Sequence, residues 1–134
     1  MDNDEMAATP SVNLEPVVIV DAANVVGSRP DGWWRDRRAA NIRLRDELGE
    51  VALLGFDSEP PPCEVVMVVE GHARGIDSTS TVAVVSAPAS GDDTIVEIVA
   101  TQPHRKRIVV TSDRELIGRV HALGAKTVGP RTVY

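Results

Sequence analysis

The sequence predicts a single three-layer α/β/α domain built on a mostly parallel sheet of four to five strands. Four short runs are continuously apolar and rich in β-branched residues, which is typical of strands buried on both faces of a parallel sheet. Segments with helical spacing of apolar residues lie between these runs, and strand–helix alternation of this kind produces small α/β folds. The length of 134 residues suits one domain with an ordinary hydrophobic core.

The strand candidates follow one another at intervals along the chain. The first four lack the in–out alternation of half-exposed strands, so we expect helices to cover both of their faces. A fifth candidate is short. The five runs are residues 17–20, 65–69, 82–85, 108–110 and 127–128.

The longest predicted helix spans residues 33–54, where Ala40, Leu44, Leu48 and Val51 form one apolar stripe. A loop follows over residues 55–62, because three consecutive prolines oppose regular structure there.

Two shorter helices are expected nearer the C-terminus. Residues 92–101 place Ile95, Ile98 and Val99 together. Residues 112–123 begin with Ser-Asp-Arg-Glu, which fits a capping box, and end before Gly124.

The first 15 residues differ in composition from the rest of the chain. They contain four acidic residues and no Lys or Arg, so residues 1–15 are expected to be a disordered acidic tail and residues 16–134 the folded domain.

No apolar run is long enough to span a membrane. The single cysteine, Cys63, excludes an internal disulfide framework and a Cys-rich zinc site, and a cytoplasmic location is the default expectation.

Carboxylates follow the predicted strands at the edge where parallel sheets bind ligands. Asp21 and Glu70 directly follow the first two strands, and Asp113 lies just past the fourth. Asp92 and Asp93 open the helix after the third strand. Such acids repel one another unless they are protonated or neutralised by a cation. Oxygen ligands without a Cys or His cluster suit Mg²⁺ or Mn²⁺, which can activate water and stabilise a phosphoryl transition state.

Each carboxylate also has a structural interpretation. An acid in the first turn of a helix, such as Asp113 or either member of the Asp92–Asp93 pair, favours the helix dipole or caps the helix. Glu70 is equally consistent with a surface acid. Asp21 is the strongest functional candidate, because it ends an apolar strand, has no expected local capping partner, and would be a costly unpaired buried charge.

Three segments resemble the motifs of NYN domains, a branch of the PIN-like nuclease superfamily. VVIVDAAN at residues 17–24 resembles their first strand and D-x-x-N motif. GDDTIVE at residues 91–97 is similar to their middle acidic helix start, and TSDREL at residues 111–116 to their late T-S-D motif. The resemblance extends over roughly residues 16–130 and is greatest to YacP-like bacterial proteins. Ala22 departs from the pattern, which usually has glycine after the first Asp.

The resemblance implies a Mg²⁺- or Mn²⁺-dependent ribonuclease site. Its metal-binding acids would be Asp21, Asp113 and one of the Asp92–Asp93 pair, with the choice left open by the sequence. Homodimers are common among small PIN-like domains, so a homodimer is a further expectation. The remaining implied site residues are Asn24 after the first acid, Glu70 after the second strand, and the hydroxyls of Thr111 and Ser112 near the metal.

A basic segment with two tryptophans leaves the same predicted edge. Helical spacing directs Trp33 toward the core and Trp34 along a polar stripe with Arg38, Asn41 and Arg45. An exposed aromatic between arginines can stack a base while the arginines contact phosphates, although this tryptophan could also pack on its own loop. The basic run 104–107 precedes the fourth strand, so we expect a solvated loop at the opposite end of the sheet. The proposed substrate-binding residues are Arg29, Trp34, Arg38, Thr111, Ser112 and Arg114, of which Arg114 could instead serve the capping turn.

The leading functional hypothesis is a metal-dependent endoribonuclease in which metal-activated water hydrolyses RNA phosphodiester bonds. The alternative is a non-catalytic RNA-binding or assembly module that keeps the fold. A haloacid-dehalogenase-type enzyme is disfavoured because Ala23 stands where its second Asp is needed, and neither glycine signature of a nucleotide-binding fold occurs.

Overall fold

The computed structural model describes residues 14–133, and it confirms the predicted fold class. The predicted tail, residues 1–15, lies outside the described residues except for residues 14 and 15. Five parallel strands form one sheet in the order β3-β2-β1-β4-β5. The strands are β1 (Val17–Asp21), β2 (Glu64–Val69), β3 (Val82–Ser86), β4 (Arg107–Val110) and β5 (Lys126–Val128).

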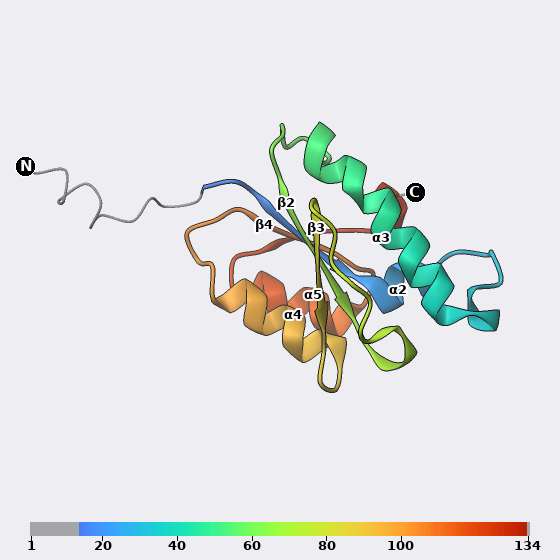
Figure 1. Ribbon diagram of the computed structural model, residues 1–134. Coiled ribbons are helices and arrows are strands. Elements are labelled where there is room, and N and C mark those ends of the chain that lie inside the picture. Colours follow the sequence, from blue (N-terminus) through green and yellow to red (C-terminus); the bar gives the residue numbers. More distant parts are fainter. Residues whose placement is uncertain (1–13, 134) are drawn as a thin grey trace, which may run out of the picture.

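Helices cover both faces of the sheet (Figure 1). Helices α2 and α3 pack on one face, and α4 and α5 pack on the other. No helix within residues 14–133 has the length and hydropathy of a membrane-spanning segment. The helices are α2 (Ala22–Gly27), α3 (Arg37–Leu54), α4 (Gly91–Ala100) and α5 (Arg114–His121), with single 3-10 turns η1 (Trp33–Arg35), η2 (Gly71–Ala73) and η3 (Pro130–Val133).

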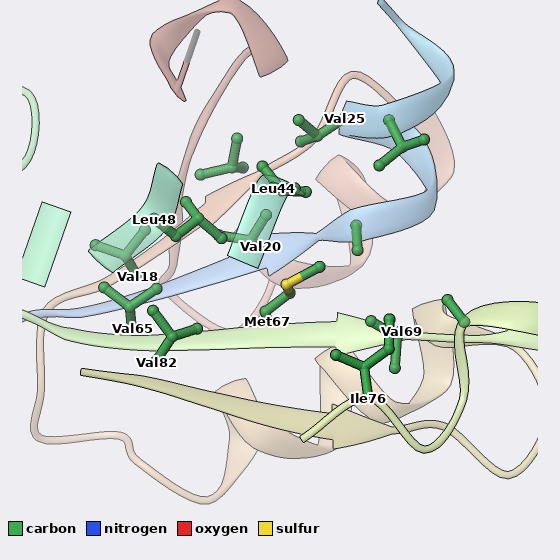
Figure 2. Packing of buried hydrophobic residues seen from close by; sticks show 14 of the residues in the cluster. Val18, Val20, Val25, Leu44, Leu48, Val65, Met67, Val69, Ile76 and Val82 are labelled. Atoms are coloured by element: carbon green, nitrogen blue, oxygen red, sulfur yellow. The ribbon is translucent and has the colours of Figure 1, made fainter. Parts of the chain in front are cut away.

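The central strand β1 is buried on both faces, as its unbroken apolar sequence predicts. Val18 and Val20 pack into the cluster under α2 and α3, where Leu44 and Leu48 of α3 meet the sheet (Figure 2). The alternate residues of β1 belong to the cluster under α4 and α5. Because side chains alternate along a strand, β1 contributes residues to both hydrophobic cores.

The sheet order places a topological switch point beside β1. β2 and β3 lie on one side of β1, whereas β4 and β5 lie on the other. In open parallel sheets, ligands bind outside the carboxyl ends of the strands at such a point. The end of β1 and the residues after β4 therefore form the expected site.

The predicted helix over 33–54 begins later than its periodicity suggests. Asp36 has a non-helical backbone (φ −152°, ψ 86°), and its side chain accepts a hydrogen bond from the Ala39 amide at 3.0 Å, so α3 starts at Arg37. The two tryptophans form a separate 3-10 turn and are out of register with α3. Asn41, predicted on an exposed polar stripe, is instead buried.

Helix α2 was not predicted, since six residues are too few to show helical periodicity. The start of α5 also differs from the prediction, because Asp113 rather than Ser112 is the N-cap and accepts from the Leu116 amide at 3.0 Å.

The basic run 104–107 is at the opposite end of the sheet, but it is not wholly a solvated loop. Arg107 is the first residue of β4 and is buried. Its guanidinium donates to the carbonyls of Val99 and Leu123 at 2.8 Å each, and to that of Arg105 at 3.2 Å. These hydrogen bonds to backbone carbonyls offset the free-energy cost of burying the guanidinium, because its N–H groups keep acceptors inside the protein.

Candidate active site

Asp21 lies at the switch point and is only 4% exposed. The Thr111 hydroxyl donates to its Oδ2 at 2.8 Å, and the Asn24 amide donates to its Oδ1 at a longer 3.4 Å. Asp21 is therefore the N-cap of α2, and the expectation that it has no local capping partner was wrong. The unforeseen helix supplies that partner.

Asn24 joins the first strand to the segment after β4. Its Oδ1 accepts from the Ser112 amide at 2.9 Å and from the Ser112 hydroxyl at 3.0 Å. The Asp113 amide donates to the Thr111 hydroxyl at 3.1 Å. The D-x-x-N and T-S-D motifs thus form one hydrogen-bonded unit across the gap between β1 and β4.

Replacing Thr111 by valine tests this unit. Valine keeps the shape but leaves Asp21 Oδ2 and the Asp113 amide without their hydrogen-bond partner, while Asp21 Oδ1 keeps the bond from the Asn24 amide, so we expect a loss of about 1–2 kcal/mol of unfolding free energy. Urea denaturation of wild type, Thr111→Val and Thr111→Ser measures it. The serine variant keeps the hydroxyl and should stay near wild type; equal losses in both variants would contradict a role for this hydroxyl.

The adjacent acids at the start of α4 face different ways. Asp92 is half-buried and lines the same hollow as Asp21. Asp93 is exposed and forms an ion pair with Arg119 at 3.0 Å. Ser90 caps the helix by accepting from the Asp92 amide at 3.1 Å. Of the two acids that the sequence left open, the structure brings Asp92 into the candidate site.

Glu70 reaches the site from the end of β2. Its Oε1 accepts from the Gly91 amide at 3.0 Å. A Cβ at position 91 would lie 2.6 Å from that same oxygen, so any other residue there would push the Glu70 carboxylate from its place. The first residue of α4 therefore helps to hold Glu70 in place.

These acids line one open hollow of about 360 Å³ at the carboxyl edge of the sheet. Burial raises the pKa of Asp21 to about 6, against its hydrogen bonds from Thr111 and Asn24, and the neighbouring acids Asp92 and Glu70 raise it further. The lining residues are Asp21, Ala23, Asn24, Glu70, Ser90, Asp92 and Asp113.

The pKa of Asp92 is also raised, first by burial and then by the negative charges of Asp113 and Glu70. Mutual repulsion of this kind is relieved by a cation, and carboxylate and amide oxygens are suitable ligands for Mg²⁺ or Mn²⁺. Within residues 14–133, however, no three acidic, histidine or cysteine side chains are close enough together to hold a metal ion. The carboxylate and amide oxygens that line the hollow are of the kind that binds Mg²⁺ or Mn²⁺. In this arrangement, the carboxylates of Asp21 and Asp113 serve as helix caps.

A basic and aromatic surface lies beside the acidic hollow. Trp34 is 57% exposed, as predicted, and the Arg35 guanidinium carbon lies 5.9 Å from its ring centroid. Trp34 lines an open hollow of about 530 Å³ together with Arg35, Arg38 and His72. The Arg38 guanidinium also donates to the Arg74 carbonyl at 3.0 Å.

A smaller pocket joins the two hollows. It shares Ala23 and Glu70 with the acidic hollow, and Arg37 and His72 with the basic one. A continuous surface therefore runs from the carboxylates to Trp34. Negative and positive ends of one groove suit a polyanion that meets bound cations at one end and arginines at the other.

Comparison with known proteins identifies the fold. No family model matches the chain, and no curated protein matches it. Among solved structures, it is similar to Rae1 (YacP) from Bacillus subtilis, a NYN-domain protein, with a TM-score of 0.72 and 18% identity over 88% of this chain and 72% of that one. The chain has the fold of this NYN-domain protein. The predicted resemblance is thus confirmed at the level of the fold.

Of the six proposed substrate-binding residues, only Trp34 and Arg38 line one of the three hollows. Thr111 and Ser112 instead donate hydrogen bonds to Asp21 and Asn24 of the acidic hollow.

The remaining two, Arg29 and Arg114, lie apart from the site. Arg29 pairs with Glu47 at 2.6 Å and donates to the Val133 carbonyl at 3.5 Å, so its guanidinium links the loop after α2 to α3 and the C-terminal turn. Arg114 is exposed after Asp113 and lines none of the three hollows.

Arg37, Asn41 and His72 were not placed in a pocket by the sequence analysis. All three line the smaller pocket of the NYN-like fold. Trp33, expected to point toward the core, packs against the core and lines this pocket as well. Helical spacing gave no signal for this pocket, because Trp33 belongs to a separate turn and α3 begins only at Arg37.

Proposed function

We propose that this chain is a divalent-metal-dependent ribonuclease that hydrolyses phosphodiester bonds in RNA. The observation that carries the proposal is the convergence of Asp21, Glu70, Asp92 and Asp113 on one hollow at the switch point of a NYN-like fold. Asp21 and Asp113 also cap helices, and Glu70 binds the Gly91 amide, but these local roles do not require the four acids to line one hollow. Their meeting is what a metal-dependent phosphoryl site requires.

Asp21, Asp92 and Asp113 are the proposed ligands of Mg²⁺ or Mn²⁺, with Glu70 beside them. A bound divalent cation supplies an activated water and stabilises charge on the phosphoryl group. Thr111 and Ser112 act as positioning residues, since their hydroxyls donate hydrogen bonds to Asp21 and Asn24. Asp93 and Arg29 are left out of the proposed machinery, because each is engaged in an ion pair elsewhere.

The basic end of the groove is proposed to hold the RNA. The acids repel phosphates in the absence of metal, so the attraction comes from the surface around Trp34, Arg35 and Arg38. Arginines contact phosphates, and an exposed indole stacks an unpaired base without sequence preference.

Trp34→Ala is expected to weaken RNA binding about tenfold, because stacking on an aromatic contributes about 1–3 kcal/mol per base. Fluorescence anisotropy with labelled single-stranded RNA in EDTA measures the affinity without cleavage. Leu53→Ala is the matched control, since Leu53 is also a large exposed apolar residue but lies at the far end of α3. Equal weakening by both substitutions would argue against stacking at Trp34.

Cleavage of labelled RNA by the purified chain tests the proposal. We expect cleavage in Mg²⁺ or Mn²⁺ and none in EDTA. The specific observation that favours a non-catalytic RNA-binding module is that Asp21 and Asp113 cap helices and no three ligands are assembled among the described residues. Metal-independent RNA binding that survives Asp21→Asn, without cleavage under any condition, would support that module and refute the ribonuclease.

A further inference from the structure

The smaller pocket between the acidic and basic hollows carries an inference about the substrate. Its volume is about 190 Å³, and it is less open than either neighbour. Sites for drug-sized ligands measure roughly 300–1,000 Å³, so this pocket fits a single ring system rather than a larger molecule. Trp33, Arg37, Asn41 and His72 contribute to its lining.

Asn41 is an unusual residue for this position. It is only 5% exposed, although it lies on a helix face that packs against the core. Its Nδ2 donates to the Arg37 carbonyl at 2.8 Å, which fixes the orientation of the amide. Its Oδ1 is buried and has no hydrogen-bond partner among the described residues. An unsatisfied buried acceptor costs free energy, so it calls for an explanation.

The other walls offer flat surfaces. The Arg37 guanidinium carbon lies 5.3 Å from the centroid of the Trp33 ring, so a guanidinium and an indole lie together at the pocket. Unpaired RNA bases stack on aromatic rings and on guanidinium planes, and their edges donate N–H groups to amide oxygens.

We infer that this pocket binds an unpaired nucleobase of RNA, and that Asn41 Oδ1 accepts an N–H from the edge of the base. The inference rests on the proposed function and deepens it. Because the pocket shares Ala23 and Glu70 with the acidic hollow, the base belongs to a nucleotide beside the phosphate under attack. A paired base has its Watson–Crick edge occupied, so the substrate is single-stranded at this nucleotide.

Asn41→Leu separates this role from a structural one. Leucine has similar size and removes the unpaired oxygen, and the Arg37 carbonyl keeps its helical backbone partner, so we expect thermal stability to stay the same or rise. Affinity for a short labelled oligoadenylate, measured by anisotropy in EDTA, should fall about fivefold to tenfold. Arg43→Gln, an exposed position on the same helix outside the three hollows, is the control and should change the affinity little.

A spectroscopic measurement covers the case in which Asn41→Leu fails to fold. Trp34→Phe leaves Trp33 as the single tryptophan, and oligoadenylate should quench its fluorescence if a base enters the pocket. Oligoadenylate carrying an abasic ribose at every position should not quench it.

The outcomes distinguish this inference from the ribonuclease proposal. RNA cleavage by wild type, with Asn41→Leu binding as tightly as wild type and no quenching of Trp33, would overturn the base pocket and leave the ribonuclease standing. Quenching of Trp33 and weakened binding by Asn41→Leu, without metal-dependent cleavage, would support the pocket and overturn the ribonuclease.

Discussion

Asp21→Asn is expected to lower the rate of RNA cleavage about 100-fold or more. Asparagine keeps the size and the cap of α2 but removes the negative charge at the proposed metal site. Loss of a group that acts directly on the reacting centre typically costs about 10²–10⁴ in rate. Asp92→Asn should act in the same direction, because Asp92 lines the same hollow.

Asp93→Asn is the matched control, because it makes the same chemical change at the position next to Asp92. Asp93 is exposed and paired with Arg119, and an exposed ion pair contributes little, so cleavage should stay within about twofold of wild type. Initial rates with labelled RNA in Mg²⁺ and Mn²⁺, alongside circular dichroism of each variant, measure these effects. Equal rates for wild type, Asp21→Asn and Asp92→Asn would refute the site, and a loss confined to Asp93→Asn would make Asp93 the ligand.

The second large effect is on stability in the absence of metal. Burial raises the pKa of Asp21 from 3.8 to about 6, so the folded chain holds this proton more tightly than the unfolded chain does. The contribution of Asp21 to the stability of the metal-free protein is therefore most favourable below about pH 4 and is lost as the pH rises through about 6. Asp21→Asn removes this penalty and should raise the unfolding free energy at about pH 7 by up to about 3 kcal/mol.

Urea unfolding in EDTA at several pH values measures this gain, which should shrink toward about pH 4. Mg²⁺ or Mn²⁺ should then raise the unfolding free energy of the wild type and leave that of Asp21→Asn unchanged. An ion stabilises a protein only when it binds the folded state more tightly than the unfolded state. An Asp21→Asn variant that is less stable than wild type at every pH would mean that the bonds from Thr111 and Asn24 outweigh the desolvation of the carboxylate.

The two effects have one physical origin. A charge that is costly in the empty protein is useful when a cation binds, and functional sites commonly reduce stability in this way. Loss of activity together with a gain in metal-free stability would separate a metal ligand from a purely structural acid, because a structural acid gives a loss of both.

Local patterns determined the strands and the edge that carries the acids. The β-branched runs at 17–20 and 65–69 are apolar because each strand is covered on both faces, and that burial is readable from composition. Since all five strands are parallel, residues that follow them lie at one edge whatever their order. Asp21, Glu70 and Asp113 could therefore be selected before the fold was known.

Choices within a helix turn needed the tertiary structure. Asp92 and Asp93 are equivalent as first-turn acids, but a helix turns about 100° per residue, so only one can face the hollow. Packing of Ile95 and Val99 against the sheet sets that rotation and selects Asp92, which lies three and seven residues before them.

The base-sized pocket also depended on long-range packing. The helix begins only after Asp36, so the tryptophans are out of register with α3. Asn41 is buried, although a continuous helix from residue 33 predicts it on the polar stripe with Trp34. The sequence by itself determined which side chains are apolar and where the strands end. Only the tertiary structure decided which polar atoms meet, because that depends on the helix rotation that buries the most apolar surface.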